Sequence, residues 1–599
     1  MVRLMSIGGT KRARSQRRRA LFCAAALAAC LPGIASAARW LRLPLWGAEV
    51  RAFAVDPFEA DRIYLGTSRG NFYGSADGGT TWRALAPGPA FPGFVATALV
   101  TDPSAPGRLW AALAGPYEGG LVAVSADRGA TWTTLARWRH SVATRALALS
   151  SGPHPTLAIG GDDGVRLSRD GGRTWTPTGG GTDGLRQVES LAFDPTDPQT
   201  LYAGTWRQAF RTKDGGATWV RIADGMVLDA TVYSWDFDAR QPRDVWVSTC
   251  GWVYHSDDGG DRWTRFTQGF TNRRSQAVRR DPTRPGVLYA ATVGGLHRST
   301  DGGRNWQRIS RESLVVTALA VDPRSGRLFV GTEGEGVFTS DDAGTTLAPA
   351  SRGLAEGRVA DLVADPNDPS RVYFFRAYGG EESGVWVAEG TKVRRVSEDP
   401  LPPAGSLTAL RDSAGKTVLL LASSAGLKLS RDGGARWTAA PAAPPGSPVA
   451  VFGPPYRQPI LVTSEGVFRT LDAGATFEAL RGAPSGAVAA ELVAGADRAP
   501  VLEVRTSDTD YRWDGRWWTQ RKRAVLSGGL FAAEANAASS AGAWSRLADV
   551  DGQLVWEEGD RRLALTSPRP GLALATAASA AGGRVYIGTA GDGLFLFEP

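Results

Sequence analysis

The chain has 599 residues, and its 68 Lys and Arg against 60 Asp and Glu give a formal net charge of +8. This length exceeds the size at which one hydrophobic core keeps growing, so two structural units or one very large closed unit are expected. The four histidines have no metal-ligand spacing, Cys250 has no neighbouring histidine, and no phosphate-binding loop occurs, so neither a metal nor a cofactor is predicted.

The first 37 residues have the pattern of a secretory signal peptide. Seven basic residues precede an apolar run at 20–34, which is too short to span a bilayer comfortably, and the small residues Ala35-Ser36-Ala37 follow it. Cleavage after Ala37 predicts an exported protein, periplasmic or extracellular. A second choice is a lipoprotein box at Leu27-Ala28-Ala29-Cys30, in which acylation of Cys30 would supply a lipid anchor.

Export changes the meaning of the positive charge. Without its first 37 residues the chain keeps 61 basic side chains (68 minus 7) and 60 acidic ones, a net charge near +1. No block of Lys or Arg remains to follow a phosphate backbone, so no nucleic-acid partner is predicted. The mature chain has no predicted transmembrane span, and Cys250, as its one cysteine, allows no internal disulfide.

A short motif beginning Ser75-Ala76-Asp77-Gly78 recurs as Ser/Thr-x-Asp-x-Gly-x-Thr-Trp, with copies roughly 40–50 residues apart, the size of one four-stranded propeller blade. We call each copy an Asp-box hairpin. Its hydroxyl and carboxylate can accept backbone N–H bonds, its glycine permits a left-handed turn, and its tryptophan can pack against the next blade. Nine copies cannot all be active sites, so a structural role is predicted for Asp77, Asp127, Asp170, Asp214, Asp258, Asp301, Asp342, Asp432 and Asp472.

Three segments with strand character precede each Asp-box hairpin. Before Asp214 they are residues 190–193, 201–205 and 209–212, with a turn at Asp194-Pro195, and the segment after the tryptophan is the fourth strand. Degenerate copies of the motif near Trp386, Trp513 and Trp556 bring the total to about thirteen repeats. The last repeat supplies only three strands, so residues 39–43 are predicted to complete its blade and join the two termini.

The predicted fold class is therefore all-β, with two tandem, roughly seven-bladed Asp-box β-propellers, and one large ring as the alternative. The predicted boundaries are residues 1–37 for the signal peptide and 38–355 for the first propeller. Residues 356–599 are predicted to form a second, degenerate propeller, closed with the N-terminal strand.

Together these repeats resemble the Asp-box, or BNR, β-propeller superfamily, which includes family 74 xyloglucanases, sortilin-type (VPS10) domains, sialidases and assembly factors of the Ycf48/Hcf136 type. The resemblance covers nearly the whole mature chain and implies fold more than function. Family 74 glycosidases match best in size and in tandem layout. They place two catalytic aspartates, an acid and a base, across the cleft between their rings.

The sequence departs from the family 74 pattern where one of those aspartates is expected. Ser68 stands at that position in Gly66-Thr67-Ser68-Arg69, and residues 45–50 replace the Gly-rich opening. A serine cannot act as the carboxylic acid. The resemblance to sialidases is limited to Leu41-Arg42-Leu43-Pro44, which is weakly similar to their N-terminal Arg-Ile-Pro signature.

The turns between the second and third strands of the repeats carry unusual aromatic and charged residues. Such turns lie on the face where propellers usually meet ligands, so they are predicted to form a binding rim, although packing between blades would also account for them. The predicted rim residues are Arg69, Phe72, Tyr117 with Glu118, Trp206 with Arg207, Trp252, and Tyr378 with Glu381 and Glu382.

Asp236 is the sharpest single departure from the repeat. Its strand aligns with 190–194 and places a carboxylate where other repeats carry a small apolar residue, and the next repeat places Arg279 there. An ion pair between Asp236 and Arg279 is predicted at the central channel, as a channel filler or as part of a binding pocket.

Two functions from different classes remain. The favoured one is an exported, non-catalytic propeller that binds a partner protein or a glycan, and an assembly factor of the Ycf48 type would be one such protein binder. The alternative is a family 74-like hydrolase of xyloglucan or a related β-glucan, with Asp236, Glu381 and Glu382 as its candidate catalytic residues.

Overall fold

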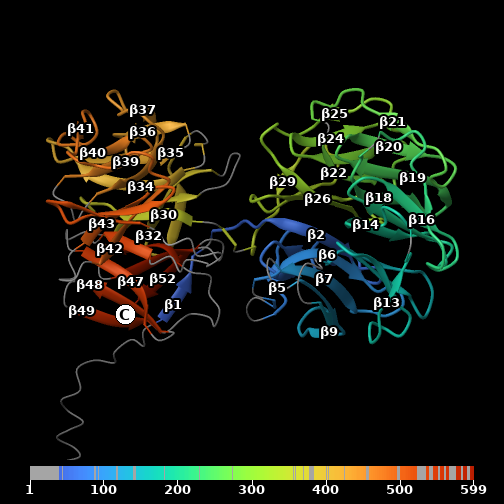
Figure 1. Cartoon of the computed structure of the whole chain (residues 1–599). Coiled ribbons are helices and arrows are strands. Elements are labelled where there is room, and N and C mark those ends of the chain that lie inside the picture. The colour runs from blue at the N-terminus through green and yellow to red at the C-terminus, as the bar shows by residue number, and fades with distance from the viewer. Residues whose placement is uncertain are drawn as a thin grey trace, which may run out of the picture.

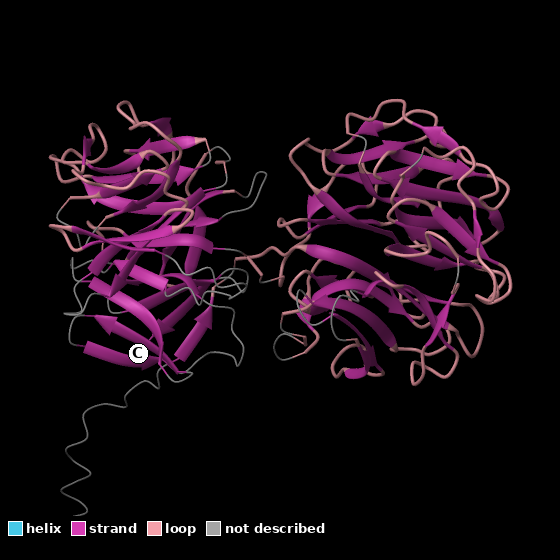
Figure 2. Cartoon of the chain, viewed as in Figure 1, coloured by secondary structure: helices cyan, strands magenta, loops and turns pink. Residues whose placement is uncertain are grey.

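The structure of the protein is a computed structural model. It describes residues 39–43, 45–86, 90–91, 93–115, 119–138, 144–180, 182–227, 229–272, 274–354, 356–357, 359–368, 370–376, 383–398, 401–402, 404–423, 425–453, 458–494, 500–522, 535–538, 544–550, 553–558, 561–565, 575–581, 584–589 and 594–598. In this part of the chain the secondary structure consists of strands without helices (Figure 2), as predicted.

Seven sheets of four strands, each strand paired with the next in chain order, make up the first ring. Their strands are β2 (Val50–Val55), β3 (Ile63–Thr67), β4 (Phe72–Ser75), β5 (Arg83–Ala84); β6 (Val95–Thr101), β7 (Leu109–Gly115), β8 (Gly119–Ser125), β9 (Thr133–Arg137); β10 (Thr144–Leu149), β11 (Leu157–Gly161), β12 (Gly164–Ser168), β13 (Thr176–Thr178); β14 (Val188–Phe193), β15 (Leu201–Thr205), β16 (Ala209–Thr212), β17 (Val220–Arg221); β18 (Val232–Asp238), β19 (Gln241–Thr249), β20 (Trp252–Ser256), β21 (Thr264–Phe266); β22 (Ser275–Arg280), β23 (Leu288–Thr292), β24 (Gly295–Ser299), β25 (Gln307–Arg308); β26 (Val316–Val321), β27 (Leu328–Thr332), β28 (Val337–Ser340) and β29 (Ala348–Pro349).

Six further sheets make up the second ring. Their strands are β30 (Val359–Ala364), β31 (Arg371–Arg376), β32 (Gly384–Glu389), β33 (Lys392–Arg395); β34 (Ala404–Arg411), β35 (Thr417–Ser423), β36 (Gly426–Ser430), β37 (Thr438–Ala439); β38 (Pro448–Phe452), β39 (Ile460–Thr463), β40 (Gly466–Arg469), β41 (Glu478–Ala479); β42 (Ala489–Ala494), β43 (Pro500–Arg505), β44 (Thr509–Trp513), β45 (Trp518–Lys522); β46 (Ala535–Ala538), β47 (Trp544–Val550), β48 (Gln553–Glu558), β49 (Arg561–Leu565); and β50 (Ala575–Ala581), β51 (Arg584–Thr589) and β52 (Leu594–Glu598), with β1 (Arg39–Arg42).

The first strand of each sheet is its innermost strand, and contacts between these strands close the rings. From β2 each inner strand contacts the next, through β6, β10, β14, β18, β22 and β26, and β26 contacts β2 again. A second series runs from β30 through β34, β38, β42, β46 and β50 back to β30. The described residues therefore form one ring of seven sheets and one of six (Figure 1).

The two termini complete one sheet of the second ring, as predicted. β1 pairs antiparallel with β52, with Trp40 opposite Phe597 and Leu41 opposite Leu596. In Figure 1 the blue β1 lies beside β52, whereas β2, the next strand in sequence, belongs to the other ring. The pairing covers an edge of β52 that would otherwise present unpaired backbone groups.

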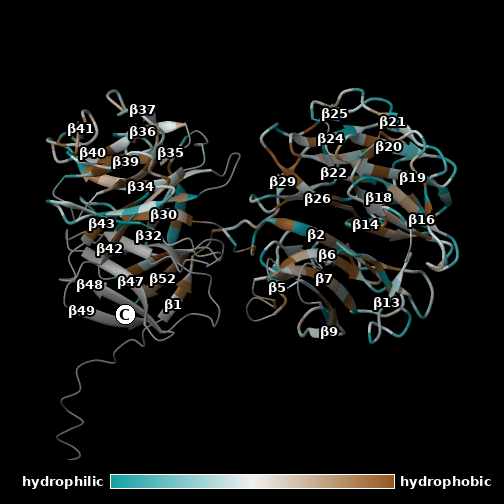
Figure 3. Cartoon of the chain, viewed as in Figure 1, coloured by the Kyte–Doolittle hydropathy of each residue, from teal (hydrophilic) through white to brown (hydrophobic). Residues whose placement is uncertain are grey.

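The cores lie between neighbouring sheets. Within the second strands nearly every residue is buried, as in β3 and β15, because these strands are covered on both faces by other sheets. Figure 3 shows apolar residues along strands such as β2 and β7, and polar residues on the surrounding loops.

The Asp-box hairpins have the hydrogen bonds that their sequence predicts. In the first one, Asp77 accepts from the Ser75 hydroxyl at 2.7 Å, the Thr81 amide at 2.9 Å and the Thr81 hydroxyl at 2.6 Å. Gly79, at φ 81°, donates its amide to Ser75 Oγ at 2.8 Å. All nine aspartates accept from the Ser or Thr two residues earlier, so each closes its own hairpin.

The tryptophan that ends the first Asp-box hairpin joins neighbouring sheets. Trp82 is buried, and its indole N–H donates at 2.8 Å to the carbonyl of Ala350, which follows the last strand of the neighbouring sheet β26–β29. The hairpin thus fixes a turn and also connects two sheets of the ring.

Candidate binding face

A β-bulge interrupts the start of every inner strand of the first ring. The pairing with the second strand shifts there by one residue, and the skipped residues are Arg51, Thr97, Arg145, Glu189, Tyr233, Gln276 and Thr317. A bulge leaves its extra residue outside the ladder and re-aims its side chain, and bulges are over-represented beside functional sites. All seven bulge residues are polar or charged.

The second ring has a different chemistry at the same positions. The shifts in its inner strands skip Ala360, Gly405, Val449 and Thr576, and the pairings of β42 with β43 and of β46 with β47 have no shift. A polar set of bulge residues is therefore a property of the first ring.

The bulges lie beside the turns that were predicted to form a rim. Val50 at the start of β2 pairs with Thr67 at the end of β3, and the turn from β3 to β4 follows immediately. We call this end of the first ring the bulge face. The Asp-box hairpins connect the third and fourth strands and lie at the opposite end, which we call the Asp-box face.

Charged side chains on the bulge face form a connected group. Arg145 pairs with Glu189 on the next inner strand, and its Nη2 lies 2.9 Å from the Oδ1 of Asp162. Burial raises the pKa of Glu189, while the charge of Arg145 opposes that rise. Further round the ring, the Arg274 guanidinium lies 5.6 Å from the centre of the Tyr233 ring.

Aromatic residues lie on the same face. The side chain of Trp206, on the turn between β15 and β16, is 51% exposed, and its carbonyl accepts from the Thr231 hydroxyl at 2.6 Å. Trp252, at the start of β20, has a positive φ of 89°, which is rare for a residue other than glycine, and packs 6.1 Å from Phe270.

The other predicted rim residues are placed differently. Arg69 is half-buried on the turn between β3 and β4. Phe72 is 3% exposed and stacks on Trp132 at 4.5 Å, so it belongs to the core between two sheets rather than to the rim. Tyr117, Glu118, Tyr378, Glu381 and Glu382 lie outside the described residues.

Asp236 forms an ion pair with Arg280 rather than with the predicted Arg279. The Nε of Arg280 donates to Asp236 Oδ2 at 2.7 Å, whereas Arg279 donates to the carbonyls of Trp235 at 3.2 Å and Val278 at 2.7 Å. Both arginines therefore reach β18, Arg279 at a backbone carbonyl and Arg280 at the Asp236 carboxylate. Arg280 also lies 3.2 Å from Asp244, which makes Asp236 part of a network between two sheets.

Glu356 is a buried carboxyl group that the sequence pattern did not reveal, because the segment between β29 and β30 has no periodicity. It accepts from Asn71 Nδ2 at 2.7 Å and from Thr67 Oγ1 at 3.1 Å, on the turn that holds Ser68. Burial raises its pKa to about 7. This carboxyl group is 2% exposed and therefore closed to a substrate.

No helix in the described residues is long and apolar enough to cross a membrane. Likewise, no group of three or more His, Cys, Asp or Glu side chains in that part of the chain is arranged to hold a metal ion.

Comparison with models of known protein families gives no match, and neither does comparison with curated protein sequences. Solved structures are similar over nearly the whole chain. An ancestral GH74 enzyme has a TM-score of 0.63 at 15% identity, covering 93% of this chain and 92% of its own. The GH74 xyloglucanase from Xanthomonas campestris has a TM-score of 0.54 at 18% identity, covering 94% and 100%.

PorZ, an essential surface component of the type-IX secretion system of Porphyromonas gingivalis, is also similar, with a TM-score of 0.52 at 12% identity, covering 93% of this chain and 86% of its own. At these identities the likeness concerns the fold alone. The two rings of sheets and the similarity in fold to these structures show that the chain is a β-propeller protein.

Proposed function

We propose that this chain is an exported, non-catalytic β-propeller that binds a partner protein or a glycan on the bulge face of its first ring. The observation that carries the proposal is the contrast between the rings. Seven polar bulge residues gather at one end of the first ring, whereas the second ring has four such bulges, three of them with a small or apolar residue.

The chemistry of the bulge face suits binding. Exposed aromatic side chains such as Trp206 offer a large contact area and lose little conformational entropy on binding. Ionic groups such as Arg145 and Glu189 can fix the orientation of a bound partner. Ser68, half-buried on the same face, lacks the carboxyl group that family 74 chemistry needs.

The test is a binding measurement on the mature protein, residues 38–599, with an immobilised panel of plant and bacterial glycans and with captured envelope proteins. Replacing both Trp206 and Trp252 by Ala is expected to weaken binding by at least about tenfold, because hot-spot aromatics contribute about 2 kcal/mol or more each. Trp517→Ala is the matched control, since Trp517 is 74% exposed but belongs to the second ring. Equal binding by the double variant and the control would refute the placement.

The second candidate function is hydrolysis of xyloglucan or a related β-glucan. The fold likeness to GH74 enzymes over more than nine-tenths of the chain favours it. Release of reducing sugar by the mature protein, lost in Glu381→Gln or Glu382→Gln, would establish it. Asp236→Ala is a less direct test, because Asp236 is held by Arg280 and its loss would also disturb packing.

We also propose that residues 1–37 direct export and that residues 38–355 and 356–599 are separate domains, the second closed with the N-terminal strand. Mass spectrometry of the exported protein distinguishes cleavage after Ala37 from acylation at Cys30. Limited proteolysis of the whole mature chain between β29 and β30 tests the domain division.

A further inference from the structure

We propose that a cleft on the Asp-box face of the first ring, between the sheets β6–β9 and β10–β13, binds the carboxylate of an acidic oligosaccharide. The cleft has a volume of about 590 Å³, which is within the range of ordinary ligand pockets. It lies at the opposite end of the ring from the bulge face and is independent of the function proposed above.

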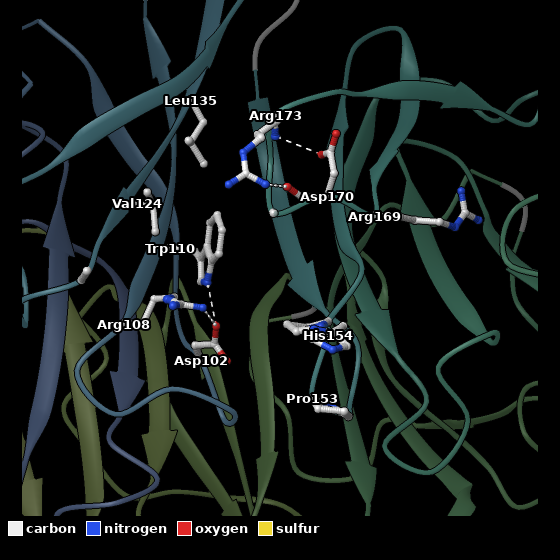
Figure 4. A pocket seen from close by; sticks show the side chains of 13 residues that line it. Asp102, Arg108, Trp110, Val124, Leu135, Pro153, His154, Arg169, Asp170 and Arg173 are labelled. Carbon is white, nitrogen blue, oxygen red and sulfur yellow. Dashed lines mark hydrogen bonds and ion pairs between the residues drawn. The ribbon is translucent and has the colours of Figure 1, made fainter.

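Two guanidinium groups from different sheets face the cleft. Figure 4 shows Arg108 and Arg173 on either side of the Trp110 ring. The Arg108 side chain is 43% exposed, and its Nη1 lies 3.4 Å from Asp102, a long contact. Arg173 is exposed, and its Nη1 donates to the carbonyl of Asp170 at 3.2 Å. Because a guanidinium carries five N–H donors, both residues keep donors for a ligand.

The two carboxylates in the lining are occupied by the protein itself. Asp102 is buried and accepts from the amide of Ser104 at 2.8 Å and from its hydroxyl at 2.6 Å. Asp170 accepts from the hydroxyl of Thr174 at 2.6 Å and its amide at 2.9 Å, and these bonds lower its pKa well below the usual range. The groups left for a ligand are therefore the cationic ones.

The loop between β10 and β11 supplies the third side of the cleft. At residues 150–156 the repeat departs from its Asp-Pro turn and reads Ser-Ser-Gly-Pro-His-Pro-Thr, which places Pro153 and His154 in the lining. Arg169 is at the edge of the cleft but turns away (Figure 4), and it donates to the carbonyl of Gly215 at 2.7 Å. The departure from the repeat and the two arginines thus meet at one place.

The apolar side of the cleft suits a sugar ring. Trp110, Val124 and Leu135 form an apolar side opposite the polar rim. A uronic acid has a rigid ring with an apolar C–H face and a carboxylate at its edge, and planar guanidinium groups pair with carboxylates in bidentate fashion. A peptide binds a β-protein most directly through a free strand edge, whereas side chains, a hairpin and a loop line this cleft.

Trigalacturonic acid is the probe, and its affinity for the mature protein is measured by titration calorimetry at low salt. Arg173→Ala is expected to weaken binding by about tenfold to a hundredfold, the range for a lost hydrogen bond to a charged group. Alanine is the native residue at this place in four other Asp-box hairpins, as Ala130, Ala217, Ala435 and Ala475, so the variant is expected to fold. Arg304→Ala, at the same place in the hairpin of Asp301, is the matched control and is expected to bind normally.

A second variant and two other ligands complete the test. Arg108→Thr places the residue found at Thr156 and Thr200 and is expected to cause a similar loss. The methyl ester of the trisaccharide, which lacks the charges, is expected not to bind. The proposal is overturned if trigalacturonic acid does not bind, if the ester binds equally, if Arg173→Ala matches Arg304→Ala, or if a triglutamate peptide binds where the sugar does not.

Discussion

At the scale of single residues, His297 is an exception within its own repeat. It lies on β24 where other sheets carry Tyr73, Phe210, Tyr254 and Phe338, and it is completely buried. Neither ring nitrogen makes a well-formed hydrogen bond within the described part of the chain. A buried polar group without a partner costs free energy, so His297 weakens the sheet that contains it.

His297→Phe is therefore expected to stabilise the first ring. Burial lowers the pKa of His297 from 6.5 to about 4, so the unfolded state takes up a proton before the folded state does. The cost of keeping His297 neutral is absent above pH 6.5 and grows as the pH falls toward 4, to at most about 3 kcal/mol. Urea unfolding at pH 5 and pH 8 should show a larger gain at pH 5, and an equal gain at both would contradict this origin.

Glu356 has the opposite dependence on pH. Its pKa is raised from 4.5 to about 7, so the folded state holds a proton that the unfolded state releases. The contribution of Glu356 to the free energy of unfolding is fully present below pH 4.5. This contribution falls as the pH rises to 7 and stays lost at higher pH, by up to about 3 kcal/mol. Glu356→Gln should leave stability at pH 4 nearly unchanged and raise it at pH 8.

The same urea titrations measure the effect of Glu356→Gln, and Glu333→Gln is a suitable control on an exposed loop of the same ring. The glutamine keeps an oxygen to accept from Asn71 and Thr67, so a loss of stability at every pH would mean that the ionised form is the native one.

At the scale of elements, the sequence predicts the features that a recurring pattern of residue types marks, and it misses those that leave no such pattern. The Asp-box hairpins, the three strands before them and the pairing of β1 with β52 follow from a pattern that recurs through the chain. The bulge residues escape notice, because a one-residue shift of register leaves no mark in hydrophobic alternation. Phe72 was misplaced for a related reason, since its nearness to a turn does not reveal that its ring reaches Trp132.

Alignment of the repeats predicts the position of Asp236 within its sheet but not its ion-pair partner. The repeat correctly placed Asp236 and Arg279 at equivalent positions, opposite Trp246 and Tyr289 on their second strands. It did not say which of two consecutive arginines reaches the Asp236 carboxylate. Arg279 donates to the carbonyl of Trp235 on the same strand, and Arg280 forms the ion pair.

At the scale of the whole molecule, the rings are joined by crossing segments at both ends of the first ring's sequence. Leu43 and Leu45 pack in the core of the second ring with Leu594 and Leu596, whereas Ala48 and Val50 pack in the core of the first. The chain thus begins in the second ring, forms the whole first ring, and returns. The stability of the second ring therefore depends on residues at the far end of the sequence.

This arrangement predicts that changes near the N-terminus destabilise the C-terminal ring. Trp40 packs at 5.1 Å from Phe597 and 6.3 Å from Phe595, so Trp40→Ala is expected to cost roughly 1–3 kcal/mol, the value of burying one large apolar side chain. Hydrogen exchange should increase in β51 and β52, while β3 and β7 of the first ring keep their protection. Trp517→Ala, also in the second ring but exposed, should change neither the stability nor the hydrogen exchange of β51 and β52. Faster exchange in β3 or β7 would mean that β1 supports the first ring instead, against the register that pairs it with β52.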